Sequence, residues 1–541
     1  MQTRLPATVM ILALCILSAT ASFPACAKAV SFPDPGLEAA IREATGLPTE
    51  SILSTDLMGL VSLDASNRGI FDLEGIQYCT DLTELHLESN EIADITPLAN
   101  LTKLETLSLY SNEIADIRPL SGLIALTTLQ LHWNGITDVS ALSGLTKLRD
   151  LSVGHNQVTD INPLSGLTDL TELYLADNEI SDISPLASLA GLEKLWIDLN
   201  QIVDVTPISA LGNLTVLALD NNQIVDIGPL SGLTRLTKLW LTANQISDIH
   251  ALSGLANLTL LASGDNQIAD ISALSGLTHL TALYLYSNRI ADVTALADLT
   301  KLETLSLYSN EIADIRPLSG LIALTTLQLH WNAITDVSAL SGLTKLSDLS
   351  VGHNQVADIN PLAGLTNLTE LYLADNEISD ISPLAGLAGL EKLWIDLNQI
   401  ADVTPISALA NLTVLALDNN QIADIGPLSG LTRLTKLWLT ANQISDIHAL
   451  SGLANLTLLA SGDNQIADIS ALSGLTHLTA LYLSGNQIAD ISPLVENAGI
   501  GRGDYVDVRH NSLVTTPESP SKSDIDVLQI RGVTVDFDPQ N

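Results

Sequence analysis

The sequence predicts a solenoid of about twenty stacked coils, and three observations support this fold class. An asparagine recurs every 22 residues, nineteen times without interruption, from Asn90 to Asn486. The same aliphatic frame surrounds each asparagine, and in the first complete copy it reads Leu82-x-x-Leu85-x-Leu87-x-x-Asn90-x-Ile92-x-x-Ile95-x-x-Leu98-x-x-Leu101. Hydrophobic residues make up 46% of the 541 residues but aromatic residues only 4%, so the core must be built from aliphatic side chains. One such coil cannot bury its apolar face alone, and the coils must therefore stack.

Residues 1–27 have the pattern of a secretory signal peptide. Arg4 precedes an apolar run over residues 5–17, and Ala21 and Ala27 mark two candidate cleavage sites. The run is too short to span a bilayer, and no later stretch is as apolar, so we expect no transmembrane segment. The chain is expected to be secreted or held at the cell surface or envelope. Lipidation at Cys26 is the alternative, although the residues before it match a lipidation box poorly.

Residues 28–60 are expected to form a helical cap, because the end of a solenoid exposes an apolar face that needs a cover. Asp34 followed by Pro35 is typical of a helix start, and Gly46 of a helix end. A second helix is expected around residues 49–60.

The repeats run over residues 61–495. A degenerate copy with Arg68 at the asparagine position precedes the nineteen regular ones, so twenty coils is the minimum count. In each coil the alternation Leu85-x-Leu87 predicts a short strand that sends the leucines inward and their neighbours outward.

The repeated asparagines are predicted to be structural. An amide side chain carries donors and an acceptor, which suits backbone groups left unpaired where the chain turns away from a strand. The predicted ladder begins with Asn90, Asn112, Asn134, Asn156 and Asn178.

An aspartate follows every one of these asparagines by four residues, from Asp94 to Asp490. It stands just before a turn that contains proline in twelve of the nineteen coils. We interpret the aspartates as caps of these turns, and a row of calcium-binding carboxylates is the alternative.

The 22-residue period breaks beyond Leu494, and residues 496–541 are expected to form a C-terminal cap. Residues 505–508 predict a last strand, residues 524–530 a short helix and residues 533–537 an edge strand.

A longer duplication overlies the repeats. Residues 101–285 recur as residues 299–483, displaced by nine coils, with only nine differences between the two copies. We therefore expect the second half to present the surface of the first half again, about 43 Å further along at roughly 4.8 Å per strand.

These residues resemble the leucine-rich repeat family, and the 22-residue form with Asn-x-Ile-x-Asp-Ile-x-Pro-Leu resembles its bacterial internalin type. The resemblance implies a right-handed α/β-type solenoid with a parallel sheet on the concave side and short 3-10 helices and turns on the convex side. It also implies a protein ligand, since internalin-type relatives bind protein receptors on host cells.

In such a fold, the positions six, four, two and one residues before each asparagine face outward on the concave side. All six tryptophans and seven of the nine tyrosines occupy these positions. Tyrosine and tryptophan are enriched at binding hot spots, although aromatic residues also suit strands in general. The predicted ligand-binding residues are Tyr110, Trp133, Tyr174, Trp196, Trp240, Tyr284, Tyr308, Trp331, Tyr372, Trp394, Trp438 and Tyr482.

The net charge of −39, from 61 acidic and 22 basic residues, argues against a nucleic-acid ligand. His132, Asp150 and His155 are expected on neighbouring strands as a possible but weaker metal site, repeated at His330, Asp348 and His353. No catalytic motif is present, and we expect neither enzymatic activity nor a cofactor. The sequence therefore predicts a monomeric module that binds a protein ligand, at one or two patches. A glycan-binding envelope protein and a passive adhesion scaffold are the alternatives.

Overall fold

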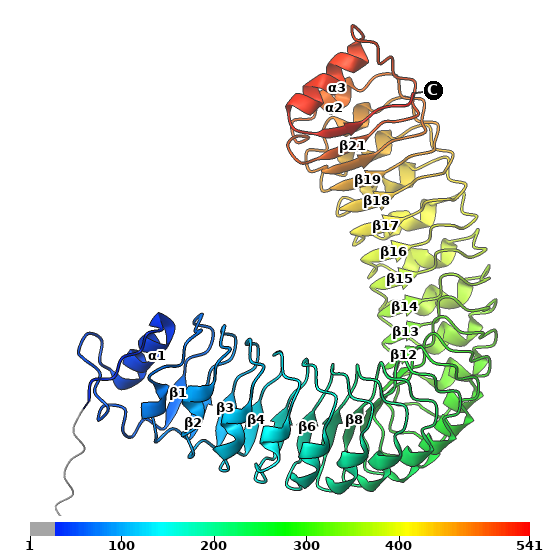
Figure 1. Cartoon of the computed structure of the whole chain (residues 1–541). Coiled ribbons are helices and arrows are strands. Elements are labelled where there is room, and N and C mark those ends of the chain that lie inside the picture. The colour runs from blue at the N-terminus through cyan, green and yellow to red at the C-terminus, as the bar shows by residue number, and fades with distance from the viewer. Residues whose placement is uncertain (1–27, 541) are drawn as a thin grey trace, which may run out of the picture.

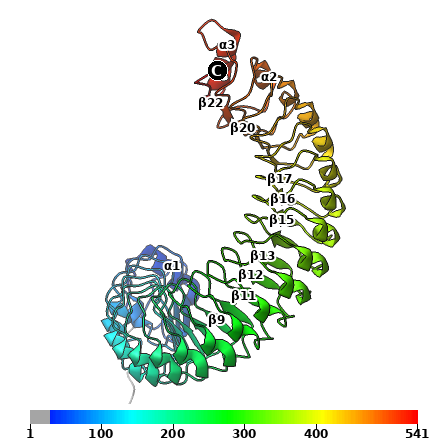
Figure 2. The ribbon, with the colours of Figure 1, turned by 90° about the vertical axis from the view of Figure 1, so that its right-hand side faces the viewer.

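The computed structural model describes residues 28–540, which form one curved solenoid with a cap at each end (Figure 1). The predicted signal peptide lies outside the described residues. A single sheet of 22 short strands lines the inner side of the curve, and the 3-10 helices lie on its outer side (Figure 2). The strands are β1 (Ser62–Asp64), β2 (Glu84–His86), β3 (Thr106–Ser108), β4 (Thr128–Gln130), β5 (Asp150–Ser152), β6 (Glu172–Tyr174), β7 (Lys194–Trp196), β8 (Val216–Ala218), β9 (Lys238–Trp240), β10 (Leu260–Ala262), β11 (Ala282–Tyr284), β12 (Thr304–Ser306), β13 (Thr326–Gln328), β14 (Asp348–Ser350), β15 (Glu370–Tyr372), β16 (Lys392–Trp394), β17 (Val414–Ala416), β18 (Lys436–Trp438), β19 (Leu458–Ala460), β20 (Ala480–Tyr482), β21 (Tyr505–Asp507) and β22 (Thr534–Asp536).

Each strand pairs in parallel with the next strand along the chain, in a register that places equivalent residues side by side. Leu85 of β2 lies opposite Leu107 of β3, and Leu107 opposite Leu129 of β4. These central leucines are fully buried, as is the isoleucine or valine that follows each asparagine by two residues. The core is thus a set of continuous aliphatic columns, and the first and third residues of every strand face outward.

The asparagine ladder joins neighbouring coils. Asn112 Nδ2 donates to the carbonyl of Leu109 in its own coil (3.1 Å) and to that of Leu87 in the preceding coil (3.0 Å). Asn112 Oδ1 accepts from the N–H of Ile92 at 3.0 Å. The predicted structural role is confirmed, and each amide satisfies backbone groups of two successive coils.

The repeated aspartates hold the convex turns, which contain 3-10 helices from η1 (Ile76–Tyr78) to η19 (Ser470–Leu472). Asp94 Oδ1 accepts from the N–H of Thr96 at 2.8 Å. The equivalent bond forms in all nineteen coils. The aspartate precedes the N-cap residue, Ile95 in this coil, by one position. The capping interpretation is confirmed with this small shift.

The residue before each asparagine adopts the left-handed conformation. From Ser89 to Asp463 its φ lies between 48° and 59°, and only the last regular coil places a glycine there, Gly485. The sequence pattern did not predict this, because the other coils carry serine, tryptophan, histidine, aspartate, asparagine, leucine or alanine at this position rather than glycine.

The N-terminal cap begins with α1 (Pro35–Thr45) at the expected place. Asp34 Oδ1 accepts from the N–H groups of Gly36 and Leu37, and Gly46 ends the helix with a φ of 70°. Asp34 Oδ2 accepts from the N–H of Phe71 at 2.9 Å, so this carboxylate also joins the cap to the first coil.

The expected second helix over residues 49–60 is wrong. The segment forms turns, and its backbone pairs with residues 28–30 through an antiparallel bridge between Ala29 and Leu53. The N–H of Val30 donates to the carbonyl of Ile52 at 2.9 Å. These backbone groups are therefore not free for helical hydrogen bonds.

The C-terminal cap consists of α2 (Ser492–Glu496), α3 (Pro520–Ile530) and the strands β21 and β22. Helix α3 begins four residues before the expected start, because Ser519 caps it and Pro520 occupies its first turn. Within residues 28–540 we find no helix that is long and apolar enough to cross a bilayer.

Candidate functional site

The twelve predicted ligand-binding residues all lie on the concave sheet or just after one of its strands. Eight of them are the third residue of a strand, namely Tyr174, Trp196, Trp240, Tyr284, Tyr372, Trp394, Trp438 and Tyr482. The remaining four follow a strand by two or three residues, and they are Tyr110, Trp133, Tyr308 and Trp331. None is fully buried, and Trp133 and Trp331 expose 57% and 56% of their surface.

A first ring cluster gathers over β3 to β7. Tyr110 stacks on His132 with ring centroids 4.4 Å apart, and Trp133 stacks on His155 at 3.9 Å. Tyr174 lies at the centre, with its ring 6.3 Å from His132, 6.1 Å from His155 and 6.3 Å from Trp196. Two histidines thus join four predicted aromatic residues into one continuous patch.

The two histidines of this cluster form hydrogen bonds with different neighbours. His155 Nδ1 lies 2.7 Å from Asp177 Oδ2, and its Nε2 lies 3.2 Å from the Tyr174 hydroxyl. His132 Nδ1 lies 3.0 Å from the Ser152 hydroxyl, and burial lowers the His132 pKa.

The structure does not bring His132, Asp150 and His155 together as a group of metal ligands. Across residues 28–540 no three histidine, cysteine or acidic side chains gather closely enough to hold a metal ion. The stacking and hydrogen bonds direct each imidazole toward its own neighbours instead. The same holds for His330, Asp348 and His353 in the second copy.

A second ring cluster repeats the first one nine coils later. Trp331 stacks on His353 at 3.8 Å, and Tyr308 stacks on His330 at 4.5 Å. Tyr286 extends this stack by one ring, 4.7 Å from Tyr308. Its counterpart before the first cluster is Glu88, so the second cluster is one ring longer.

The second half also carries a row in which rings and alanines alternate on consecutive strands. The row runs from β16 to β20 as Trp394, Ala416, Trp438, Ala460 and Tyr482. Cavities open above both alanines, one of about 210 Å³ at Ala416 and one of about 340 Å³ at Ala460. Among residues 28–540, neither Trp438 nor its counterpart Trp240 stacks on another ring.

The two halves differ at the edge of this row. The cavity at Ala460 is bounded by Gly462 and Ser484. In the first half Tyr286 stands at the position of Ser484, and its ring packs against Gly264, where an added Cβ would come within 2.6 Å of it. The expectation that the second half presents the same surface is therefore wrong here, because position 286 lies one residue beyond the duplicated stretch.

Half-buried carboxylates lie beside the row. Burial raises the pKa of Asp418 to about 6, against the opposing effect of the Thr440 N–H, which donates to it at 2.6 Å. Burial likewise raises the pKa of Asp220 to about 6 in the first half. Burial also raises the pKa of the neighbouring Asp198 and Asp396.

The comparisons with known proteins agree with this architecture. A family model described as Leucine Rich repeats (2 copies) matches residues 124–166, 168–210, 212–257, 366–408, 410–455 and 456–496, and one described as Leucine Rich repeat matches residues 78–95. The crystal structure of an internalin, inlF from Listeria monocytogenes, is 32% identical to this chain. The match covers 96% of that chain and 69% of this one, with a TM-score of 0.50. The chain belongs to the internalin-type leucine-rich repeat family.

This internalin-type chain is also similar to two further proteins, one over a short stretch of sequence and one in fold. Internalin H from Listeria monocytogenes is 41% identical over 65 residues, a match that spans 12% of each protein. The Arabidopsis receptor kinase HAESA, solved with the peptide hormone IDA and the co-receptor SERK1, shares the fold with a TM-score of 0.69 at 21% identity. That match covers 89% of this chain and 92% of the receptor chain.

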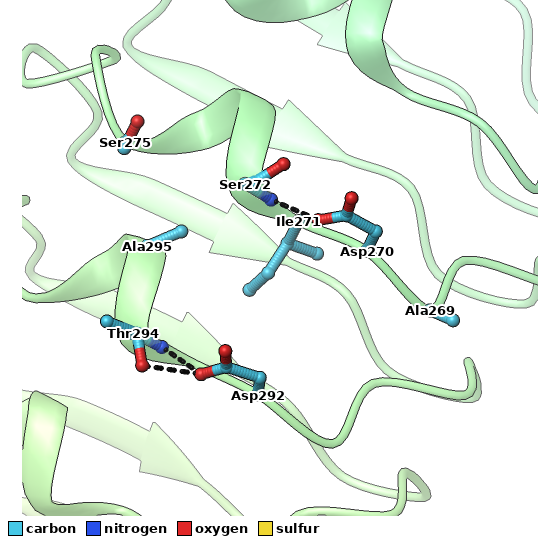
Figure 3. A pocket seen from close by; sticks show the side chains of 8 residues that line it. All are labelled: Ala269, Asp270, Ile271, Ser272, Ser275, Asp292, Thr294 and Ala295. Atoms are coloured by element: carbon cyan, nitrogen blue, oxygen red, sulfur yellow. Dashed lines mark hydrogen bonds between the residues drawn. The ribbon is translucent and has the colours of Figure 1, made fainter.

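The convex side of the internalin-type chain has a depression of about 350 Å³ between η10 (Ser272–Leu274) and η11 (Thr294–Leu296), shown in Figure 3. Asp270 Oδ1 accepts from the N–H of Ser272, and Asp292 Oδ1 accepts from the N–H and hydroxyl of Thr294. Both carboxylates therefore hold turns, as in every other coil, and we assign this depression no ligand.

The sequence pattern missed the histidines of the ring clusters as stacking partners. His132 and His155 stand at the same outward positions as the predicted rings, two and one residues before an asparagine. Their stacking on Tyr110 and Trp133 follows from strand pairing, because equivalent positions of adjacent coils lie side by side.

Proposed function

We propose that this internalin-type chain is an exported, non-enzymatic module that binds a protein ligand through its concave aromatic face. The observation that carries the proposal is the gathering of rings, since all six tryptophans and seven of nine tyrosines stand on that face. Aromatic residues with charged residues at their edge are typical of protein-binding patches. Lys194, in an ion pair with Glu172 at 2.7 Å, supplies such an edge beside Trp196.

The fold does not require these rings. The position of Trp133 is held by Ser111 and Asp177 in adjacent or nearby coils, with the same left-handed backbone. Trp133 nevertheless leaves more than half of its surface in solvent. A large exposed ring in a conformation that bulky residues seldom adopt favours a role in binding.

The comparisons support a polypeptide as the ligand class. The HAESA ectodomain, which shares the fold, is solved with a peptide hormone and a co-receptor. That likeness concerns the fold, and the ring clusters of this chain supply the chemistry of the site.

Affinity capture with the mature chain tests the proposal. We expect Trp133→Ala with Trp331→Ala to lose the captured protein, because both exposed stacks are removed. The matched control is Ile124→Ala with Ile322→Ala, a duplicated pair that is 60% exposed and lies outside the sheet. Equal capture by both double variants would contradict the proposal.

The same variants separate one binding patch from two. If both clusters bind, each single tryptophan change should weaken capture and the double change should weaken it further. Equal losses from single and double changes would restrict binding to one cluster.

A glycan is the second candidate, and the alternating row from Trp394 to Tyr482 favours it. Its rings stand on every second strand, about 10 Å apart, and cavities separate them. Retention on polysaccharide beads that is lost with Trp394→Ala and Trp438→Ala, without any captured protein, would support the glycan instead.

We further propose that residues 1–27 direct export and that the mature chain is a monomer. Mass spectrometry of the protein from its native host should locate the cleavage site and report any lipid on Cys26. Light scattering of the purified chain should give the mass of one copy, and a dimer mass would contradict the second part.

A further inference from the structure

A slot opens between the two tryptophans of the alternating row, and we call it the tryptophan slot. It has a volume of about 210 Å³ and is lined by Trp394, Asp396, Ala416, Asp418 and Trp438. The rings come from β16 and β18, and Ala416 of β17 lies between them. Because alanine is short, the space between the two rings stays open on the concave face.

The first half carries the same slot residues. They are Trp196, Asp198, Ala218, Asp220 and Trp240, on β7, β8 and β9. Ala218 and Ala416 are both 5% exposed, and burial raises the pKa of Asp220 and of Asp418 alike. None of the nine differences between the copies falls on these positions.

The carboxylates of the slot form no ion pair within the described residues, although the His353 imidazole, which is paired with Asp375, partly opposes the burial that raises the pKa of Asp396. Asp418 Oδ1 accepts from the N–H of Thr440, and a hydrogen bond with the Thr440 side chain also opposes the effect of burial on the Asp418 pKa. Among residues 28–540, no lysine, arginine or histidine nitrogen forms an ion pair with Asp396 or Asp418. Ionising two half-buried carboxylates without a cation beside them costs free energy. A positive charge supplied by a ligand would lower this cost.

Tryptophan faces attract cations, and a guanidinium is both flat and weakly hydrated, so it stacks on such faces while its N–H groups bind carboxylates. We propose that the tryptophan slot receives an arginine side chain of the protein partner, and that its counterpart in the first half receives a second one. This inference rests on the protein-binding function proposed above and specifies the chemistry of the partner.

Other ligands fit the slot less well. A neutral sugar, the second candidate ligand for the whole row, would stack on the rings and donate hydroxyl hydrogen bonds to the carboxylates, but it would bring no counter-charge. Calcium takes six to eight oxygen ligands, and the slot offers two carboxylates. A lysine ammonium is compact and strongly hydrated, so it gains less from two ring faces than a guanidinium does.

The test uses a short Gly/Ser peptide with one arginine and a matched peptide with neutral citrulline. Tryptophan fluorescence of the mature chain is titrated with each peptide. We expect the arginine peptide to bind and the citrulline peptide to bind roughly tenfold more weakly or not at all. Equal binding of the two peptides would overturn the inference.

Two sets of variants assign the binding to the slot. Asp198→Asn, Asp220→Asn, Asp396→Asn and Asp418→Asn together should weaken arginine-peptide binding roughly tenfold. Ala218→Leu with Ala416→Leu should block both slots without changing any charge. The matched control neutralises four exposed acids outside the slot, in Glu179→Gln, Glu193→Gln, Glu377→Gln and Glu391→Gln. If this control weakens binding as much as the slot variants do, the effect is one of net charge and the inference fails.

The outcomes keep this inference apart from the proposed function. Capture of a protein that depends on Trp133 and Trp331, without slot-dependent binding of the arginine peptide, would refute the slot and leave the protein-binding function standing. Slot-dependent arginine binding by a chain that captures no protein would refute the function, and with it the protein partner assigned to the slot.

Discussion

The ring of Tyr286 packs over Gly264, whereas Ser484, at the same position nine coils later, leaves the space over Gly462 open. This single difference gives two nearly identical halves different surfaces. Tyr286 is followed by a further regular coil, whereas the coil of Ser484 leads into the C-terminal cap.

Ser484→Tyr should fill the cavity of about 340 Å³ beside Trp438 and raise the free energy of unfolding by about 1 kcal/mol. Tyr286→Ser should lower it by about 2 kcal/mol, because Tyr286 also stacks on Tyr308. Urea denaturation measures both. A loss of stability in Ser484→Tyr would mean that the open cavity cannot take a ring.

Asn200→Ala should lower the free energy of unfolding by about 3 kcal/mol. The amide accepts from the N–H of Ile180, which alanine leaves unpaired. It also donates to the buried carbonyls of Leu175 and Ile197, which would keep only the donors from Asn178 and Asn222. The neighbouring exposed Gln201→Ala is the control and should change stability by less than about 0.5 kcal/mol. Similar losses for the two variants would contradict the ladder's role.

Ala243→Gly should raise the free energy of unfolding by about 0.5 to 1 kcal/mol, although glycine weakens ordinary strands. Ala243 has a φ of 55°, which glycine adopts without a Cβ penalty. Leu199→Val, at the equivalent position with a φ of 54°, should lower stability, since β-branched residues seldom adopt this conformation. Thermal and urea unfolding should both show the gain in stability for Ala243→Gly and the loss for Leu199→Val. A loss of stability in Ala243→Gly would be evidence against the left-handed backbone.

Asp418→Asn should stabilise the chain at alkaline pH but not in acid. The folded pKa of about 6 lies above the unfolded value of about 3.9, so the folded state holds a proton that the unfolded chain has lost. Stability contributed by this group therefore falls as pH rises from about 4 to about 6. Asparagine keeps an acceptor for Thr440 and removes the repulsion from Asp396, and we expect a gain of about 1 kcal/mol at pH 8 after allowing for solvent screening.

Asp446→Asn serves as the control, and we expect it to lower the stability of the chain at pH 8 rather than raise it. The backbone N–H and the imidazole of His448 lower the pKa of Asp446, so its charge favours the folded state above the unfolded pKa. Denaturation measured between pH 4 and pH 8 should show opposite changes in the free energy of unfolding for the two variants. Changes of the same sign would refute the burial argument for Asp418.

The sequence alone predicted the structure of the regular coils, because every coil carries the same residue pattern. The leucine alternation, the asparagine and the turn aspartate recur at one spacing, so strand, ladder and turn could be assigned nineteen times over. The cap had no such repetition. Residues 49–60 looked helical by composition, but their backbone pairs with residues 28–30, a contact that no local pattern encodes.

The sequence by itself determined that this chain is an internalin-type solenoid and that nearly all of its large rings stand on one face. The tertiary structure alone decided how those rings meet. Three features depend on side chains of neighbouring coils, and they are the stacking of Trp133 on His155, the open slot between Trp394 and Trp438, and the different surroundings of Tyr286 and Ser484. Those side chains are 22 residues or more apart along the chain, and only the parallel register of the sheet places them in contact.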